Sequence, residues 1–233
     1  MISVSNLVKR YGSITALDRV SFSFPDGHIF AIMGENGAGK STLLKICAGI
    51  LPYEAGTVQI DSFSITDQPL EARAVLGYLP EIPELYERIT GREFLYYIAS
   101  LRHQIDATKR ITDLATSIGI IDSLDFEIGG YSKGMKQKIS LLAALMHAPR
   151  NLLLDEPIYG LDPLAARTIQ DFIRQRQGTT IIATHSTHLV ENIADTVHFL
   201  MHGQVIHTDT TEKLLTKFPS IEDAYFYYKD KKP

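Results

Sequence analysis

The sequence predicts an α/β fold with three parts: a core of buried strands and helices, an antiparallel β region at the N-terminus, and an inserted α-helical region. Residues 1–66 carry mostly strand-like patterns, whereas residues 84–148 carry apolar residues at helical spacing. After them, apolar runs alternate with helical segments, which is typical of a parallel sheet. We therefore expect one domain over residues 1–233, with its core at about 1–83 and 149–233 and a helical subdomain at about 84–148.

The N-terminal part of the chain is expected to form strands. Val20, Phe22 and Phe24 alternate with polar residues before a turn at residues 25–27, and Val58 and Ile60 alternate in a later strand. Between them, residues 29–33 form an unbroken apolar run, as expected for a strand buried on both faces.

Two apolar stripes predict two amphipathic helices in the insertion. The first stripe consists of Phe94, Ile98, Leu101 and Ile105. The second consists of Ile111, Leu114, Ile118 and Ile121. Thr90 and Glu93 have the spacing of a capping box, so the first helix should begin just after Thr90.

The C-terminal third predicts two more buried strands, at residues 152–154 and 180–183. The helix between them should begin with Asp162 as its N-cap and Pro163 at its first position. The aromatic run at residues 225–228 predicts a helix that packs on the core or on a partner, and residues 229–233 are expected to form a solvated end.

Composition narrows the class of protein. Subtracting 27 acidic from 23 basic residues gives a net charge of −4, which argues against a protein that mainly neutralises nucleic-acid phosphates. The single cysteine, Cys47, cannot form an internal disulfide, so we expect a reducing compartment and a small core residue. We expect neither a secretion signal nor a membrane-spanning helix, so any membrane involvement should come from a partner.

The strongest chemical signal is a phosphate-binding loop of the pattern G-x-x-x-x-G-K-[ST], which follows a predicted buried strand and precedes a predicted helix. It consists of Gly34, Glu35, Asn36, Gly37, Ala38, Gly39, Lys40, Ser41 and Thr42. Glycines allow successive backbone N–H groups to point at one phosphate chain, and the following helix adds its positive end. Lys40 is expected to bridge the terminal phosphates and Ser41 to ligate Mg²⁺. The core is therefore expected to be that of a P-loop nucleotidase.

A second signal is an apolar strand that ends in Asp155 and Glu156. Adjacent carboxylates at the edge of a core repel each other unless a cation or a proton separates them. Asp155 is suited to the Mg²⁺ shell through a water molecule, and Glu156 is suited to polarise the attacking water.

Three further motifs give the chain its resemblance to a known family. They are the run YSKGMKQ at residues 131–137, which we call the signature, the run GLDP at residues 160–163 and the pair Thr184 and His185. Together with the loop and the acidic strand, they resemble the ATP-binding-cassette (ABC) ATPases along essentially the whole chain.

The resemblance implies roles for particular residues. Tyr11 would stack on adenine, Ser132 and Gly134 would bind the γ-phosphate held by the opposite protomer, Asp162 would help to couple the two sites, and His185 would contact the γ-phosphate. It also implies ATP and Mg²⁺ as ligands, a dimer that is either homo- or heteromeric, and integral membrane permease subunits as partners. Residues 82–88 would either form an ordinary surface loop or, as is usual in the family, face the membrane subunit. The chain would lie on the cytoplasmic face of the cell membrane.

Three residues depart from the family pattern. Lys133 stands where the family usually has Gly, Met135 where it has Gln, and Glu81 occupies the place of the usual metal-coordinating glutamine. These variants resemble the branch that serves two-component exporters. We therefore expect an ATPase subunit that powers export, with no nucleic acid as partner.

Alternatives stay open at this stage. A soluble mechanical ATPase of the same fold, acting on DNA or ribosomes, usually has long coiled-coil insertions or two cassettes, and this chain has neither. A kinase or GTPase would need a phosphoacceptor or guanine-reading site, and the sequence has no Asn-Lys-x-Asp. His198, His202 and His207 lie close enough in sequence for a zinc site, but we interpret them as surface histidines around a hairpin turn at Gly203.

Overall fold

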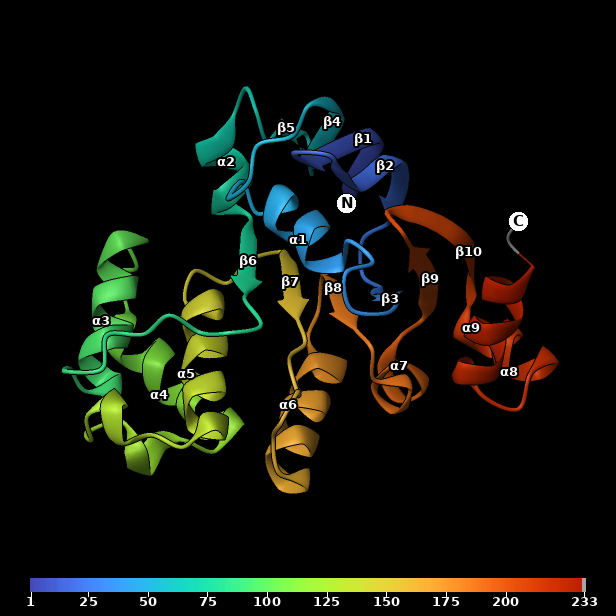
Figure 1. Cartoon of the computed structure of the whole chain (residues 1–233). Coiled ribbons are helices and arrows are strands. Elements are labelled where there is room, and N and C mark those ends of the chain that lie inside the picture. Colours follow the sequence, from blue (N-terminus) through green and yellow to red (C-terminus); the bar gives the residue numbers. More distant parts are fainter. Residues whose placement is uncertain (232–233) are drawn as a thin grey trace.

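The computed structural model describes residues 1–231, and its strands form two sheets (Figure 1). The strands are β1 (Ile2–Tyr11), β2 (Ile14–Phe24), β3 (Ile29–Met33), β4 (Ala55–Ile60), β5 (Phe63–Ser64), β6 (Leu76–Leu79), β7 (Asn151–Asp155), β8 (Thr179–Thr184), β9 (Thr196–Met201) and β10 (Gln204–Thr210). One sheet has the order β2-β1-β4-β5 and is antiparallel. The other has the order β10-β9-β3-β8-β7-β6, with only β10 antiparallel to its neighbour.

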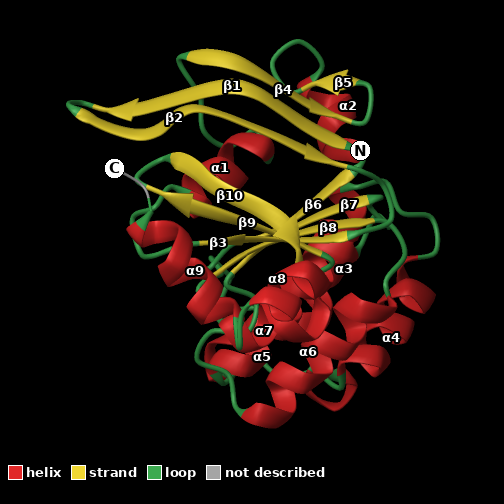
Figure 2. Cartoon of the chain, turned by 90° about the vertical axis from the view of Figure 1, so that its right-hand side faces the viewer, coloured by secondary structure: helices red, strands yellow, loops and turns green. Residues whose placement is uncertain are grey.

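The helices are α1 (Lys40–Cys47), α2 (Pro69–Ala74), α3 (Gly91–Leu101), α4 (Ala107–Ile118), α5 (Lys133–Leu145), α6 (Pro163–Gln175), α7 (Thr187–Ile193), α8 (Thr211–Lys217) and α9 (Ile221–Asp230). Figure 2 shows the antiparallel sheet above α1, the six-stranded sheet below α1, and most of the other helices beneath that sheet. This layered arrangement confirms the predicted α/β fold.

The central strands β3, β7 and β8 are apolar because both of their faces are covered. Every residue of β7 and β8 is buried, as are four of the five residues of β3. Since β3, β8, β7 and β6 run parallel, their carboxyl ends meet at one edge of the sheet. Open parallel sheets bind ligands at that edge. The phosphate-binding loop, Glu81, the pair Asp155 and Glu156, and His185 all lie at or just after the ends of these strands, whereas Tyr11 and residues 131–137 do not.

The insertion forms a group of three helices, α3 to α5, which stands at the left of Figure 1. Phe94, Ile111, Leu114 and Ile118 are buried in one cluster with Ile139 of α5. The predicted capping box is confirmed, because the Thr90 N–H donates to Glu93 Oε2 at 2.8 Å and the Glu93 N–H donates to Thr90 Oγ1 at 3.1 Å.

The two apolar stripes were predicted too long. Helix α3 ends at Leu101, which is exposed, and Ile105 is fully exposed. His103 has a φ of +52°, which turns the chain out of the helix before the stripe can continue. Likewise α4 ends before Gly119, whose φ of +67° is typical of a helix terminus, and Ile121 falls in a separate 3₁₀ turn.

The hairpin at Gly203 is confirmed, but the prediction that His198 lies on the surface was wrong. Its side chain is buried on β9, with the Phe22 and Phe24 rings each 5.2 Å away, because β2 of the other sheet covers it. Burial lowers the pKa of His198 to about 4. Within residues 1–231, no group of three His, Cys, Asp or Glu side chains is placed to hold a metal ion by itself.

The C-terminal helices complete the core. Tyr225 of α9 is buried against Phe199, which confirms that the aromatic run belongs to a packed helix. The tail was expected to be solvated from residue 229. Lys229 instead lies in α9 and pairs with Glu35, while residues 232–233 lie outside the described part of the chain.

Cys47 of α1 is buried, as predicted for a small core residue, and burial raises the pKa of its thiol to about 12. Across residues 1–231, no helix combines the length and hydrophobicity needed to cross a membrane.

Candidate nucleotide site

The loop from Gly34 to Gly39 joins the end of β3 to the start of α1. Gly39 has a φ of +107°, and a Cβ there would lie 2.5 Å from the Ala16 carbonyl oxygen, so only glycine fits. As N-cap of α1 it supplies no side-chain acceptor, which leaves the N–H groups of the first turn available to an anion. Lys40 Nζ donates to the carbonyl oxygens of Gly34 at 2.7 Å and Glu35 at 3.0 Å, so the loop wraps around its own lysine.

Asp155 ends β7 beside the start of α1. Ser41 Oγ donates to Asp155 Oδ1 at 3.0 Å, whereas Oδ2 is buried with no hydrogen-bond partner among the described residues. Burial raises the pKa of Asp155 to about 6, and the nearby carboxylates of Glu81 and Glu156 add to this rise, while the Ser41 hydrogen bond opposes it. The Ser41 hydroxyl and the Asp155 carboxylate, with its unpaired Oδ2, are oxygen donors of the kind that Mg²⁺ prefers.

Glu156 follows Asp155 directly but has different hydrogen-bond partners. Its φ of +48° turns the chain sharply, and its backbone N–H donates to the Ala183 carbonyl at 2.9 Å. The buried carboxylate accepts from Thr184 Oγ1 at 2.9 Å and from the His185 backbone N–H at 3.0 Å, and its Oε1 lies 2.6 Å from His185 Nδ1. These contacts fix the carboxylate at the end of β8.

Lys40, Ser41 and Glu156 meet in a cavity of about 340 Å³ at the carboxyl edge of the sheet, whereas Asp155 lines a neighbouring cavity. The cavity around Lys40 is lined by Ala16, Asn36, Gly37, Gly39, Lys40, Ser41, Thr42, Glu81, Glu156, Tyr159 and His185. Burial lowers the pKa of Lys40, and the negative charges of Glu156, Asp155 and Glu81 oppose that shift. The cavity thus places one buried cation beside two carboxylates, Glu81 and Glu156, with Asp155 close behind Ser41, a balance of charge suited to a phosphate chain that arrives with a divalent cation.

Not every predicted residue borders this cavity. Tyr11 lies exposed at the end of β1, with Lys9 Nζ 5.2 Å from its ring centroid. Ser132 caps α5 by accepting from the Met135 N–H at 3.2 Å, and Asp162 caps α6 by accepting from the Ala165 N–H at 2.9 Å. The remaining loop residues do not line the cavity. The Gly34 carbonyl accepts from Lys40 Nζ, Ala38 is buried, and the exposed Glu35 side chain pairs with Lys229.

Thr184 was recognised from the sequence only as part of a motif, without a role, and Tyr159 was missed altogether. Thr184 donates to the Glu156 carboxylate, and Tyr159 lines the cavity with its ring centroid 5.5 Å from that of His185. The only signal in the sequence for Tyr159 is its place between Glu156 and Asp162, since a tyrosine does not by itself indicate a role.

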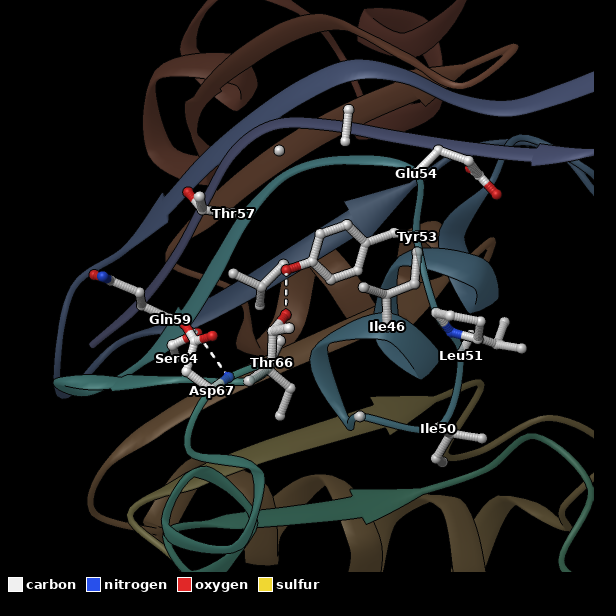
Figure 3. Close-up of a pocket in the computed structure, with 16 residues that line it drawn as sticks. Ile46, Ile50, Leu51, Tyr53, Glu54, Thr57, Gln59, Ser64, Thr66 and Asp67 are labelled. Atoms are coloured by element: carbon white, nitrogen blue, oxygen red, sulfur yellow. Dashed lines mark hydrogen bonds between the residues drawn. The ribbon is translucent and has the colours of Figure 1, made fainter.

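A second hollow, of about 710 Å³, lies between the end of α1 and strands β4 and β5 (Figure 3). Tyr53 crosses it and its hydroxyl lies 2.8 Å from Thr66 Oγ1. Its lining consists of Ile46 and residues 49–59 and 64–67, a set that contains none of the predicted site residues. The chemistry is therefore concentrated in the smaller cavity.

Comparison with known proteins shows the family of the chain. A family model described as "ABC transporter" matches residues 17–159. The chain is 34% identical to the ABC transporter ATP-binding protein NatA of Bacillus subtilis (strain 168), over 97% of this chain and 96% of that protein. It is 32% identical to the bacitracin transport ATP-binding protein BcrA of Enterococcus faecalis, over 88% of this chain and 68% of that protein. A solved structure titled as the ATP-binding subunit of an ABC transporter superposes with a TM-score of 0.90 at 28% identity, covering 98% of this chain and 99% of that one. The chain therefore belongs to the ABC transporter family, as a subunit that binds and hydrolyses ATP to drive transport.

Proposed function

We propose that this subunit powers export, as one of two ATPase protomers that act on separate membrane subunits. The observation that carries the proposal is that Lys40, Ser41 and Glu156 share one cavity, whereas Ser132 lies outside it. The export direction is supported by the departures at Lys133, Met135 and Glu81 and by the names of relatives, which refer to bacitracin transport, lantibiotic transport and linearmycin resistance.

Each polar residue of the cavity has a separate role in hydrolysis. Lys40 and the N-terminus of α1 offset the charge of the terminal phosphates. Glu156 accepts a proton from the attacking water, because its carboxylate is held at the cavity wall by Thr184 and His185. When His185 Nδ1 donates to Glu156, its Nε2 is left available toward the γ-phosphate.

Mg²⁺ fits the polar groups beside Lys40. Ser41 would hold the ion directly and Asp155 through a water molecule, with the buried Oδ2 as the oxygen that gains a partner. Glu81 lines the same cavity and would add a full negative charge where the family usually has an amide. When bound, the ion would neutralise the charge that develops on the phosphate oxygens.

A second protomer would complete each site. Ser132 is exposed on α5, and a Cβ added at Gly134 would meet nothing closer than 3.8 Å within the chain, so no internal contact requires glycine there. A phosphate approaching from the opposite chain would require it. We infer that residues of about 84–148 act as a helical subdomain that presents this signature, with Tyr11 and Asp162 serving the adenine and the coupling of the two sites.

The groove beside the helical subdomain is the proposed contact with the membrane subunit. A cavity of about 890 Å³ lies between the core and α3, and its lining includes Ile82, Phe94 and Ile98. Two apolar residues in its lining, Ile82 and Leu101, are exposed. A docked segment of the membrane subunit would cover them, and it would place this chain on the cytoplasmic face of the cell membrane.

The test is the Glu156→Gln variant, measured by phosphate release and by binding of MgATP. The amide keeps the size of the side chain but is a very poor base, so hydrolysis should fall at least about 100-fold while ATP still binds. Glu71→Gln, an exposed control outside the cavity, should keep the wild-type rate. Near-normal turnover in Glu156→Gln would exclude Glu156 as the base.

A further inference from the structure

The departure at Lys133 has a structural counterpart in the loop after Glu156. Lys133 is the first residue of α5, and its Nζ lies 4.6 Å from the ring centroid of Tyr159. The side chain also occupies the space beside Gly160, where a Cβ would lie 2.2 Å from Lys133 Nζ. Gly160 itself has a φ of +69°, a conformation that favours glycine, and Lys133 of α5 packs against the loop that contains Tyr159 and Gly160.

Tyr159 in turn contacts His185. The two ring centroids are 5.5 Å apart with an interplanar angle of 64°, an edge-to-face arrangement. His185 Nδ1 lies 2.6 Å from Glu156 Oε1. A continuous row of four side chains thus runs from the start of the signature helix to the proposed base: Lys133, Tyr159, His185 and Glu156.

The imidazole of His185 needs such support. Half of its side chain is exposed, at 48%, and among the described residues its ring nitrogens have only the Glu156 contact. One hydrogen bond leaves the ring free to rotate about that contact, whereas an aromatic ring packed at its side restricts the rotation. The negative face of a tyrosine ring attracts an ammonium group, so Lys133 holds Tyr159 in that place.

We propose that Tyr159 and Lys133 are positioning residues for His185, so that the signature helix supports the catalytic pair of its own protomer. The inference rests on the proposed function, because it assigns His185 and Glu156 to hydrolysis. Neither Lys133 nor Tyr159 needs to touch the reacting atoms. Their effect should therefore fall on kcat and depend on the aromatic ring and on the positive charge.

The kinetic test compares conservative and disruptive variants in steady-state MgATP hydrolysis. Tyr159→Leu should lower kcat about three- to tenfold with KM changed less than about twofold, while Tyr159→Phe keeps the ring and should stay near wild type. Lys133→Met should lower kcat about two- to fivefold, as expected for the loss of one exposed cation–π contact. Lys133→Arg keeps the positive charge and should have a kcat near that of the wild type. Lys138→Met, which removes a charge farther along α5, is the control and should leave kcat unchanged.

A spectroscopic test reads His185 directly. The side-chain NMR signals of ¹⁵N-labelled histidine, assigned by their loss in His185→Asn, should shift in Tyr159→Leu and in Lys133→Met but not in Lys138→Met, with no nucleotide present. Thermal melting checks that each variant is folded.

The outcomes separate this inference from the proposed function. Unchanged His185 signals in Tyr159→Leu, or a loss in Tyr159→Phe as large as in Tyr159→Leu, would overturn the positioning role. A rise in KM with unchanged kcat would also overturn it, because Tyr159 would then act on nucleotide binding. Full activity in Glu156→Gln would instead refute the proposed function, whatever Tyr159 and Lys133 do.

Discussion

The buried histidine on β9 predicts a specific sensitivity to acid. His198 Nδ1 lies 2.8 Å from Thr208 Oγ1, but Nε2 is buried with no partner among the described residues, so a proton added there would create an unpaired charge. The Phe22, Phe24 and Phe30 rings surround the imidazole. We expect His198→Leu to remove this sensitivity, because leucine has a similar volume and does not titrate.

The magnitude follows from the pKa of His198, which burial lowers from 6.5 to about 4. Below pH 6.5 the unfolded chain takes up a proton that the folded chain does not, so the free energy of unfolding falls as the pH falls toward 4. Between pH 7 and pH 5 the loss from this one group is about 2 kcal/mol, and it stops growing below pH 4. Leaving the Thr208 hydroxyl without its partner should cost His198→Leu about 1 kcal/mol at every pH.

Urea unfolding at pH 7 and pH 5 measures this difference. Circular dichroism is the suitable signal because the chain contains no tryptophan. The wild type should lose about 2 kcal/mol more than His198→Leu on acidification. His103→Asn, at an exposed position whose φ of +52° asparagine tolerates, should behave like the wild type. Equal acid losses in the wild type and His198→Leu would refute the assignment of a buried, neutral His198.

The other predictions concern the nucleotide site. Lys40→Ala should lose binding of the triphosphate, measured by isothermal titration calorimetry with ATP, because the charge that offsets the phosphate oxygens is gone; wild-type affinity would exclude that role. Glu81→Gln should keep most ATPase activity because it retains an oxygen ligand, whereas Glu81→Ala should raise the Mg²⁺ concentration needed for half-maximal rate. An unchanged Mg²⁺ titration in Glu81→Ala would place this side chain outside the metal shell. Glu156→Gln with MgATP should shift from monomer to dimer in light scattering, and adding Ser132→Glu should abolish the shift while each monomer still binds ATP. A persistent monomer of Glu156→Gln would mean that a different chain supplies the opposing signature, or that dimerisation needs the membrane subunit.

Features that depend on neighbouring residues along the chain could be predicted from the sequence. The phosphate-binding loop, the capping box at Thr90 and the caps at Ser132 and Asp162 are each encoded within a few residues, and the structure has all of them. The buried strands could be predicted for the same reason, since an unbroken apolar run needs cover on both faces wherever it lies. Helix ends were predicted less well, because a single residue such as His103 can leave the helix while the apolar spacing continues.

Which of these loops, strands and helices contact one another depends on the tertiary structure. The order of strands in the six-stranded sheet differs from their order in the chain, so β3 lies between β8 and β9, and the ends of β3, β7 and β8 come together. That packing places His185 beside Glu156, buries His198 under β2 and leaves Ser132 outside the cavity that holds Lys40. It also brings Lys133 to Tyr159. Such contacts join residues far apart in the chain, and their geometry depends on how whole sheets and helices pack, which no local pattern of residues records.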